Sequence, residues 1–264
     1  MYFKGEKIGF KNIRIYIILI ITSIILLIPI GLMISTSLKQ GGFSNYITVF
    51  SNPRIPRSLL NSLIISVPSI IIVIFISSLT AFALSKLKII AKGAIFSIFL
   101  AGLMIPVSAI IVQLFIMIVK FKLLNNYLSV ILPVSALVMP FGLLVLKNYM
   151  DDIPNEIIDA ALIDGCTPFA IYMKIVLPLS MPAVAAVTIF TFLASWNEFL
   201  MPLIFLQKQS LMPATVIPKL YMGDIYGSVS LWMTSFVVLT LPVLILYIIF
   251  QRYFIKGLTA GAIK

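Results

Sequence analysis

Acidic side chains gather in one short stretch of this chain. Five of the eight Asp and Glu residues fall within fourteen positions: Asp151, Asp152, Glu156, Asp159 and Asp164. The chain has no histidine and one cysteine, Cys166, which excludes an intramolecular disulfide and leaves no Cys and His metal constellation. We therefore interpret the acidic stretch as a binding surface, and we predict no catalytic residue, metal site or cofactor.

The residues from Pro154 to Gly165 have the pattern of a short helix. Proline is tolerated in a first helical turn, acids near that end suit the helix dipole, and Gly165 offers the left-handed residue that commonly ends a helix. Glu156 and Asp159 lie beside an apolar stripe. The stripe consists of Ile157, Ile158, Ala161 and Leu162. This pattern favours a helix laid into the groove of a protein partner.

The alternative is an amphipathic helix that rests among lipid headgroups. Such helices favour basic polar faces, because the cytoplasmic leaflet is negatively charged, whereas this one is acidic. Beyond Gly165, Pro168 predicts a second short helix through Lys174. Pro178 and Pro182 then predict a turn back into the bilayer.

The composition indicates a membrane protein. The 264 residues are 61% hydrophobic and 10% charged, with a mean hydropathy of +1.17, whereas soluble domains carry about 45–50% apolar and about 25% charged residues. The net charge of +11 does not indicate nucleic acid as a partner, because the basic residues are scattered over short connections between apolar runs. We expect the chain to lie in the lipid bilayer.

Six apolar segments are long enough to cross a hydrocarbon core of about 30 Å, which takes roughly 20 helical residues. They lie near Ile15–Ile34, Leu63–Leu84, Ile95–Val119, Leu128–Leu146, Val184–Leu206 and Leu231–Phe250. Five prolines inside them predict kinks: Pro106, Pro133, Pro140, Pro202 and Pro242. The runs do not alternate as the strands of a porin do. The expected fold is an all-α membrane protein with six transmembrane helices in one domain, residues 1–264.

The basic residues predict the orientation of these spans. With residues 1–14 in the cytoplasm, twelve of the nineteen basic residues lie inside, in the direction of the positive-inside rule. A secretory signal is the alternative for the first span, but its uncharged stretch from Ile15 to Leu38 exceeds the usual apolar region of about 7–15 residues. We expect both termini in the cytoplasm, together with a loop at residues 147–183 and a tail at residues 251–264.

The acidic loop resembles the coupling loop of ABC-importer permeases. Asp159-Ala160-Ala161 is followed after three residues by Gly165 and after nine more by Ile175-Val176-Leu177-Pro178. Asp159 stands where the motif of that family has Glu, which keeps the charge and shortens the side chain. Ser195–Leu203 and Gln251–Lys264 are similar to the maltose-type second permease of carbohydrate ABC importers. The resemblance runs from about Asn45 to the C-terminus.

The resemblance implies a type I importer transmembrane domain in a prokaryotic inner or plasma membrane. The implied function is the permease subunit of an ATP-driven, binding-protein-dependent importer for a sugar or oligosaccharide. Its implied partners are a homologous second permease, two cytoplasmic ATPase subunits and an extracytoplasmic solute-binding protein. The chain lacks a Gly-x4-Gly-Lys-Ser/Thr phosphate loop, so another chain must bind and hydrolyse ATP. The residues assigned to ATPase coupling are Glu156, Ile157, Asp159, Ala160, Ala161, Asp164 and Gly165.

Two further groups of residues each have two possible roles. Glu198 is the only acid within a predicted span, and with Trp196 and Asn197 it belongs either to a structural or subunit contact or to the solute path. Near the C-terminus, Thr259, Gly261 and Lys264 belong either to a basic anchor in the headgroups or, as the resemblance implies, to an ATPase contact.

Two other classes of protein are alternatives to an importer. An ion-coupled secondary transporter needs ionisable groups inside its spans, and Glu198 is the only one. A purely structural membrane protein would not need the acid-Ala-Ala loop. Both are therefore disfavoured.

Overall fold

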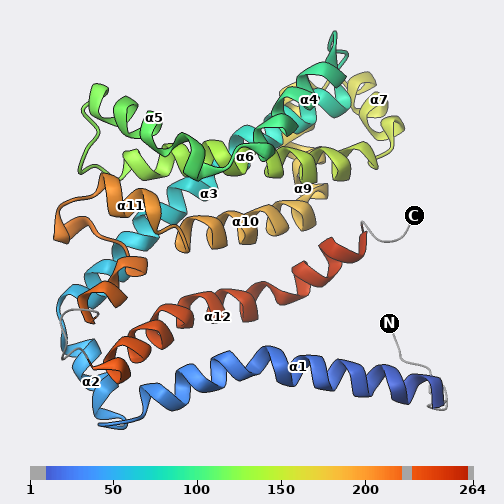
Figure 1. The fold of residues 1–264 in the computed structure, drawn as a ribbon. Helices are drawn as coiled ribbons and strands as arrows, with labels where there is room; N and C mark the ends of the chain where they lie inside the picture. The colour runs from blue at the N-terminus through green and yellow to red at the C-terminus, as the bar shows by residue number, and fades with distance from the viewer. Residues whose placement is uncertain (1–9, 222–227, 261–264) are drawn as a thin grey trace. The chain divides into compact units, whose positions relative to one another are not determined.

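The computed structural model describes residues 10–221 and 228–260, and every regular element among them is a helix (Figure 1). The predicted all-α fold class is confirmed. The helices are α1 (Phe10–Ser37), α2 (Ser44–Ser51), α3 (Arg54–Lys86), α4 (Lys92–Ala101), η1 (Gly102–Met104), α5 (Val107–Lys120), α6 (Leu128–Asp151), α7 (Asn155–Ile163), α8 (Pro168–Ile171), η2 (Tyr172–Val176), α9 (Leu177–Leu179), α10 (Met181–Trp196), α11 (Leu200–Phe205), η3 (Gln209–Leu211), η4 (Ala214–Tyr221) and α12 (Val229–Ala260).

Among the described helices, four are long and apolar enough to cross a membrane by themselves. They are Ile15–Ser37 of α1, the whole of α3 and of α6, and Val229–Ile249 of α12. Two bent pairs raise the number to six if each pair is one span. The pairs are Lys92–Met104 with Val107–Lys120, and Pro168–Leu179 with Met181–Trp196. The six predicted spans are therefore reached only when the bent pairs are counted.

The third predicted span is wrong as a continuous helix. The helix stops at Met104 and resumes at Val107 after a bend of 97°. Pro106 disfavours helical geometry in the residue before it, and Ile105 is extended, with φ −86° and ψ 110°. The chain therefore turns at this proline, where the sequence predicted only a kink. Pro133 and Pro140, in contrast, lie inside the continuous helix α6.

The fifth predicted span is wrong at its C-terminal end. Helix α10 ends at Trp196, and α11 is a separate short helix that contains Pro202. A proline has no N–H to donate to the carbonyl four residues earlier, and its ring collides with that carbonyl. Here that carbonyl belongs to Glu198, and it accepts a hydrogen bond from Thr215 Oγ1 at 2.9 Å instead.

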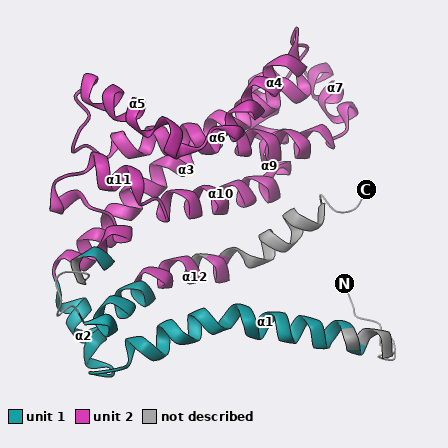
Figure 2. Cartoon of the chain, viewed as in Figure 1, with its two compact units in different colours: residues 1–52, 218–238 teal, residues 53–217, 239–264 magenta. Residues whose placement is uncertain are grey.

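The chain divides into two compact units, shown in different colours in Figure 2. Unit 1 comprises Met1–Asn52 and Pro218–Val238, and unit 2 comprises Pro53–Ile217 and Leu239–Lys264. In unit 1 the Ser37 carbonyl accepts hydrogen bonds from Asn45 Nδ2 at 2.8 Å and Thr234 Oγ1 at 3.2 Å. The single domain over residues 1–264 stays a prediction.

Unit 2 is built around α3, α6 and α10, each of which packs on the other two. Helices α3 and α6 run side by side in the same direction. The Tyr127 hydroxyl donates to Asn61 Oδ1 toward their N-terminal ends, and the Ser85 hydroxyl donates to Asp151 Oδ1 at their C-terminal ends, both at 2.7 Å. Small side chains allow such helices to approach closely. A Cβ added to Gly142 of α6 would lie 2.9 Å from Ser77 Oγ.

We expect Gly142→Val to destabilise unit 2 by about 1–3 kcal/mol, because added atoms in a well-packed core force side chains off their preferred rotamers. Besides Ser77, the new Cβ would meet Val73 of α3 and Val187 of α10, both at 3.2 Å. Thermal unfolding of the purified protein in detergent measures the effect. The control is Gly93→Val in α4, where nothing lies within 4 Å. Equal unfolding temperatures for the two variants would contradict this packing.

Candidate functional site

Helix α7 and the two residues that follow it contain the predicted coupling residues, and both ends of the helix follow from local sequence. Pro154 precedes its first residue, and Gly165 has φ +78°, which confirms the predicted left-handed glycine. The Gly165 N–H donates to the Leu162 carbonyl and the Cys166 N–H donates to the Ala161 carbonyl, both at 3.0 Å. This pair of bonds is the Schellman motif, which satisfies the last carbonyls of a helix. The helix spans nine residues.

The apolar residues of α7 divide between two surfaces. Ile158 and Ala161 are 7% and 5% exposed and belong to the core of this chain. Ile157, Leu162 and Ile163 are 40%, 49% and 87% exposed. The structure contradicts half of the predicted stripe as a partner surface, because α7 needs Ile158 and Ala161 to pack against its own chain. Ile157 and Leu162, in contrast, stay exposed. The outward apolar surface comprises Ile157, Leu162 and Ile163.

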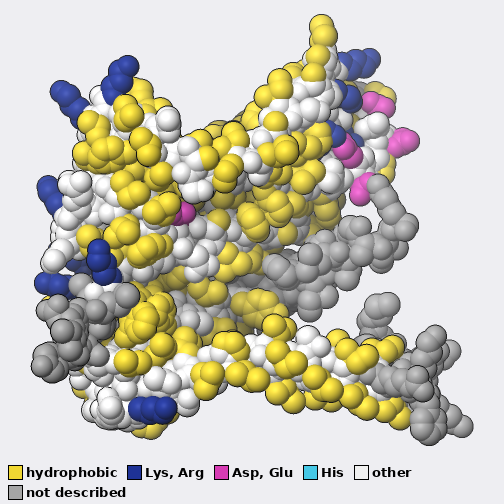
Figure 3. Space-filling model, in the orientation of Figure 1, with side chains coloured by type: hydrophobic (Ala, Val, Ile, Leu, Met, Phe, Trp, Pro, Cys, Tyr) yellow, Lys and Arg dark blue, Asp and Glu magenta, His cyan; other side chains and the backbone are white. Residues whose placement is uncertain are grey.

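The predicted acidic coupling residues surround that outward surface. Glu156, Asp159 and Asp164 are exposed, as are Ala160 and Gly165. Figure 3 shows acidic side chains gathered at the α7 end of the view, beside basic ones. A hollow next to α7 is lined by Tyr149, Asp152, Ile153, Pro154, Ile157 and Leu179. The site therefore offers apolar side chains and carboxylates to a partner. Within the described residues no group of three His, Cys, Asp or Glu residues could hold a metal.

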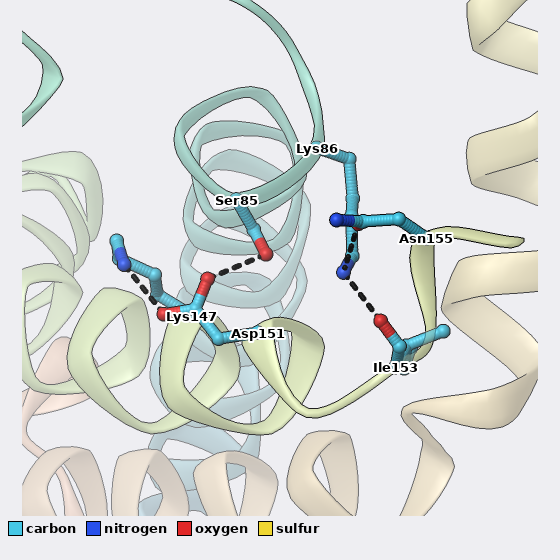
Figure 4. Close-up of polar contacts among 6 residues, drawn as sticks. All are labelled: Ser85, Lys86, Lys147, Asp151, Ile153 and Asn155. Atoms are coloured by element: carbon cyan, nitrogen blue, oxygen red, sulfur yellow. Dashed lines mark hydrogen bonds and ion pairs between the residues drawn. The ribbon is translucent and has the colours of Figure 1, made fainter. Parts of the chain in front are cut away.

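Hydrogen bonds join the residues at the start of α7 to the C-terminal end of α3, which is also bonded to the C-terminal end of α6 (Figure 4). Lys86 Nζ of α3 donates to the Ile153 carbonyl at 2.6 Å and to Asn155 Oδ1 at 3.2 Å. Asp151 of α6 accepts from Ser85 at 2.7 Å and forms an ion pair with Lys147 at 2.6 Å. These contacts hold the first residue of α7 against α3.

The segment after α7 forms a second helix, as predicted, but a longer one. It begins at Pro168, where Thr167 Oγ1 accepts a hydrogen bond from the Ala170 N–H, and it continues past Lys174 to Leu179. Its middle, η2, is π-helical. The chain then bends by 77° between Pro168–Leu179 and Met181–Trp196, which agrees with the predicted turn at Pro178 and Pro182.

Glu198 lies in the break between α10 and α11, outside both helices. Its side chain is half-buried, and Oε1 accepts a hydrogen bond from the Met201 N–H at 3.0 Å. Trp196 is buried, stacks on Phe192 with 5.2 Å between ring centroids, and donates Nε1 to the Leu239 carbonyl at 3.4 Å. Asn197 is exposed. The structure thus uses Glu198 and Trp196 in packing and hydrogen bonding within the chain.

The predicted C-terminal contact is only partly described. Thr259 lies within α12, which ends at Ala260. Gly261 and Lys264 lie outside the described residues.

Sequence reasoning missed one contact between α3 and the coupling segment, as we call residues 152–180 between α6 and α10. The hydroxyls of Ser78 in α3 and Tyr172 in η2 lie 2.7 Å apart in the core. The two residues are 94 positions apart, so no local spacing joins them. The only signal in the sequence was the serine itself among the apolar residues of α3. Because α3 contains several serines, this signal could not single out Ser78.

Comparisons with known proteins agree on one family. Residues 58–260 match the family described as binding-protein-dependent transport system inner membrane component. The chain is 36% identical to the arabinooligosaccharides transport system permease protein AraQ of Halalkalibacterium halodurans, over 77% of this chain and 72% of that protein. It is 32% identical to the trehalose/maltose transport system permease protein MalG of Thermococcus litoralis, over 96% and 97%.

A solved structure has the same fold. It is a chain of a bacterial ABC transporter involved in the import of the acidic polysaccharide alginate, and it matches 96% of this chain and 100% of its own with a TM-score of 0.79 at 22% identity.

Proposed function

This chain belongs to the binding-protein-dependent transport system inner membrane component family, and we propose that it lines the solute path of an ATP-driven importer for a sugar or oligosaccharide. It is a multi-pass membrane protein and a permease subunit, not an enzyme. The observation that carries the proposal is the match over residues 58–260, which includes the whole of α6 and α7 and residues 58–86 of α3.

The names of the relatives support the proposed class of solute. AraQ is named for arabinooligosaccharides, MalG for trehalose and maltose, and a protein of Streptomyces coelicolor that is 30% identical is named for diacetylchitobiose. These are carbohydrates of different composition. We therefore propose a sugar or oligosaccharide as the solute.

The exposed surface of α7 supports a separate ATPase as the partner. An exposed apolar side chain such as Ile163 next to carboxylates is suited to a partner's groove with basic groups at its rim. We infer that α7 contacts one of two cytoplasmic ATPase subunits, and that a homologous permease and a solute-binding protein complete the assembly. In this arrangement α7, both termini and the tail lie in the cytoplasm. Glu156, Asp159, Asp164 and Ile157 form the contact, and Gly165 ends it.

Uptake by the reconstituted transporter tests this function. Proteoliposomes that contain this chain, its partner permease and its ATPase are given the solute-binding protein with labelled maltose, trehalose, an arabinooligosaccharide or diacetylchitobiose. We expect uptake of at least one of these sugars only when ATP is present. Uptake that follows a proton or sodium gradient without ATP would instead indicate a secondary transporter.

Deletion of Thr259–Lys264 tests the proposed role of the tail. If the tail contacts the ATPase, the variant should insert normally but lose most ATP-dependent uptake. Arg252 and Lys256 are retained, so a basic anchor in the headgroups would survive the deletion. The measurement is uptake at equal membrane levels of the two proteins. Unchanged uptake would show that the tail is only an anchor.

A further inference from the structure

The segment between α6 and α10 is attached to α3 at two separate points. At its entry, Lys86 holds the Ile153 carbonyl and Asn155 (Figure 4). In its second helix, Pro168–Leu179, which we call the exit, the Tyr172 hydroxyl forms a hydrogen bond with the Ser78 hydroxyl. Ser78 and Lys86 are separated by about two helical turns, or about 12 Å along α3. A segment attached at two such points cannot pivot about either one.

The exit contact is the more buried of the two. Ser78 is fully buried and Tyr172 is 2% exposed. The Tyr172 ring also packs on Phe82, at 5.5 Å between centroids, and Phe82 lies one turn after Ser78 on the same face of α3. The entry contact uses the terminal ammonium group of a lysine, and Asn155 is exposed to solvent. Water weakens such exposed contacts more than it weakens a buried hydrogen bond.

No other hydrogen bond between described residues joins Pro168–Leu179 to α3. Tyr172 is also the first residue of the π-helical segment η2. Such segments are rare and often occur at functional sites. Tyr172 therefore provides the one hydrogen bond, among described residues, between the exit of the coupling segment and α3.

We propose that Tyr172 is a positioning residue for coupling, whose hydroxyl makes α7 and α3 move as one body. This role rests on the proposed function, because it takes α7 as the surface that the ATPase displaces. Without the hydroxyl, only apolar packing such as that of Tyr172 on Phe82 holds the exit of the coupling segment against α3, so a displacement of α7 moves α3 less. The response of α3 to ATP binding would then be smaller.

Amide hydrogen exchange on the assembled transporter tests the proposal without any solute. Exchange is compared with and without a non-hydrolysable ATP analogue, over α7 and over residues 75–86 of α3. In the natural protein we expect the analogue to change both regions. In Tyr172→Phe, which keeps the aromatic packing, α7 should still respond while the response of residues 75–86 falls by about three- to fivefold, the equivalent of one hydrogen bond.

A second pair of variants separates positioning from stability. Ser78→Ala leaves the Tyr172 hydroxyl buried without its partner and should lower the unfolding temperature, whereas Ser78→Ala with Tyr172→Phe removes both groups and should largely restore it. We expect the response of α3 to stay low in the double variant. Recovery of that response along with stability would overturn the proposal.

Two controls test whether general loosening of the core gives the same result. Ser69→Ala removes a buried α3 hydroxyl that bonds only within its own helix, to the Ile65 carbonyl. Tyr127→Phe removes a tyrosine bond of the same 2.7 Å length at the other end of α3. The proposal would be overturned if the response of residues 75–86 to the analogue fell as much in either control as in Tyr172→Phe. It would also be overturned if that response were unchanged in Tyr172→Phe. If the ATP analogue does not change amide exchange in α7 of the natural protein, the proposed function itself is refuted, and the role of Tyr172 with it.

Discussion

Asp159→Lys is expected to reduce ATP-driven uptake by about tenfold or more while membrane insertion stays normal. Asp159 is exposed on α7, and no hydrogen bond or ion pair to another described residue holds its carboxylate. The substitution should therefore leave the fold unchanged. A reversed charge at the centre of a protein contact costs about 2 kcal/mol or more, which is more than a factor of ten in binding. Copurification of the ATPase and uptake at equal membrane levels are the measurements.

Gly165→Val should have a comparable effect for a different reason. Its φ of +78° is strained for any residue with a Cβ, and most of all for a β-branched one, although nothing lies within 4 Å of the added atom. The end of α7 would have to change conformation. Gly165→Asn should keep activity, because asparagine tolerates this region, and Asp159→Glu should do so because it keeps the charge. If Asp159→Lys and Gly165→Val both take up solute at the rate of the natural protein, the assignment of α7 as the coupling surface is wrong.

Glu198→Leu should destabilise the break between α10 and α11 by about 1.5–3 kcal/mol, the usual contribution of a hydrogen bond to a charged group. Its carboxylate is the acceptor for the Met201 N–H at the start of α11. Leucine would leave that N–H unpaired. Glu198→Gln retains an acceptor oxygen and should preserve both assembly and most uptake.

The two outcomes at Glu198 separate its possible roles. Thermal unfolding and subunit assembly report the structural role, and uptake at saturating solute reports a role in the path. Impaired uptake with normal unfolding and assembly would place Glu198 in the solute path. Natural behaviour of Glu198→Leu in all three measurements would show that neither role exists.

Local signals in the sequence predicted the parts of the site that local geometry determines. Gly165 ends α7 in the left-handed conformation, and Pro168 starts the next helix. These outcomes depend on the backbone preferences of single residues, which the sequence states directly. The apolar runs likewise indicated the membrane helices, because length and hydropathy alone decide whether a helix can span the bilayer.

The features that the sequence did not predict depend on contacts between distant elements. Ile158 and Leu162 have the same apolar character, and only the packing of α7 on its own chain separates the buried residue from the exposed one. The 97° bend near Pro106 also exceeds the kink that a proline predicts by itself. The Ser78 and Tyr172 contact has no sequence pattern at all, since polar pairs across helices are specified by the fold.

Photocrosslinking from α7 tests the central assignment most directly. A benzophenone group is attached to Ile163→Cys in a Cys166→Ala background, and the assembled transporter is illuminated in membranes. Because Ile163 is 87% exposed, we predict a covalent product with the ATPase subunit, and none from the matched variant Ile158→Cys, whose position is 7% exposed. Crosslinking of Ile163→Cys to lipid alone, with no product that contains the ATPase, would contradict the account.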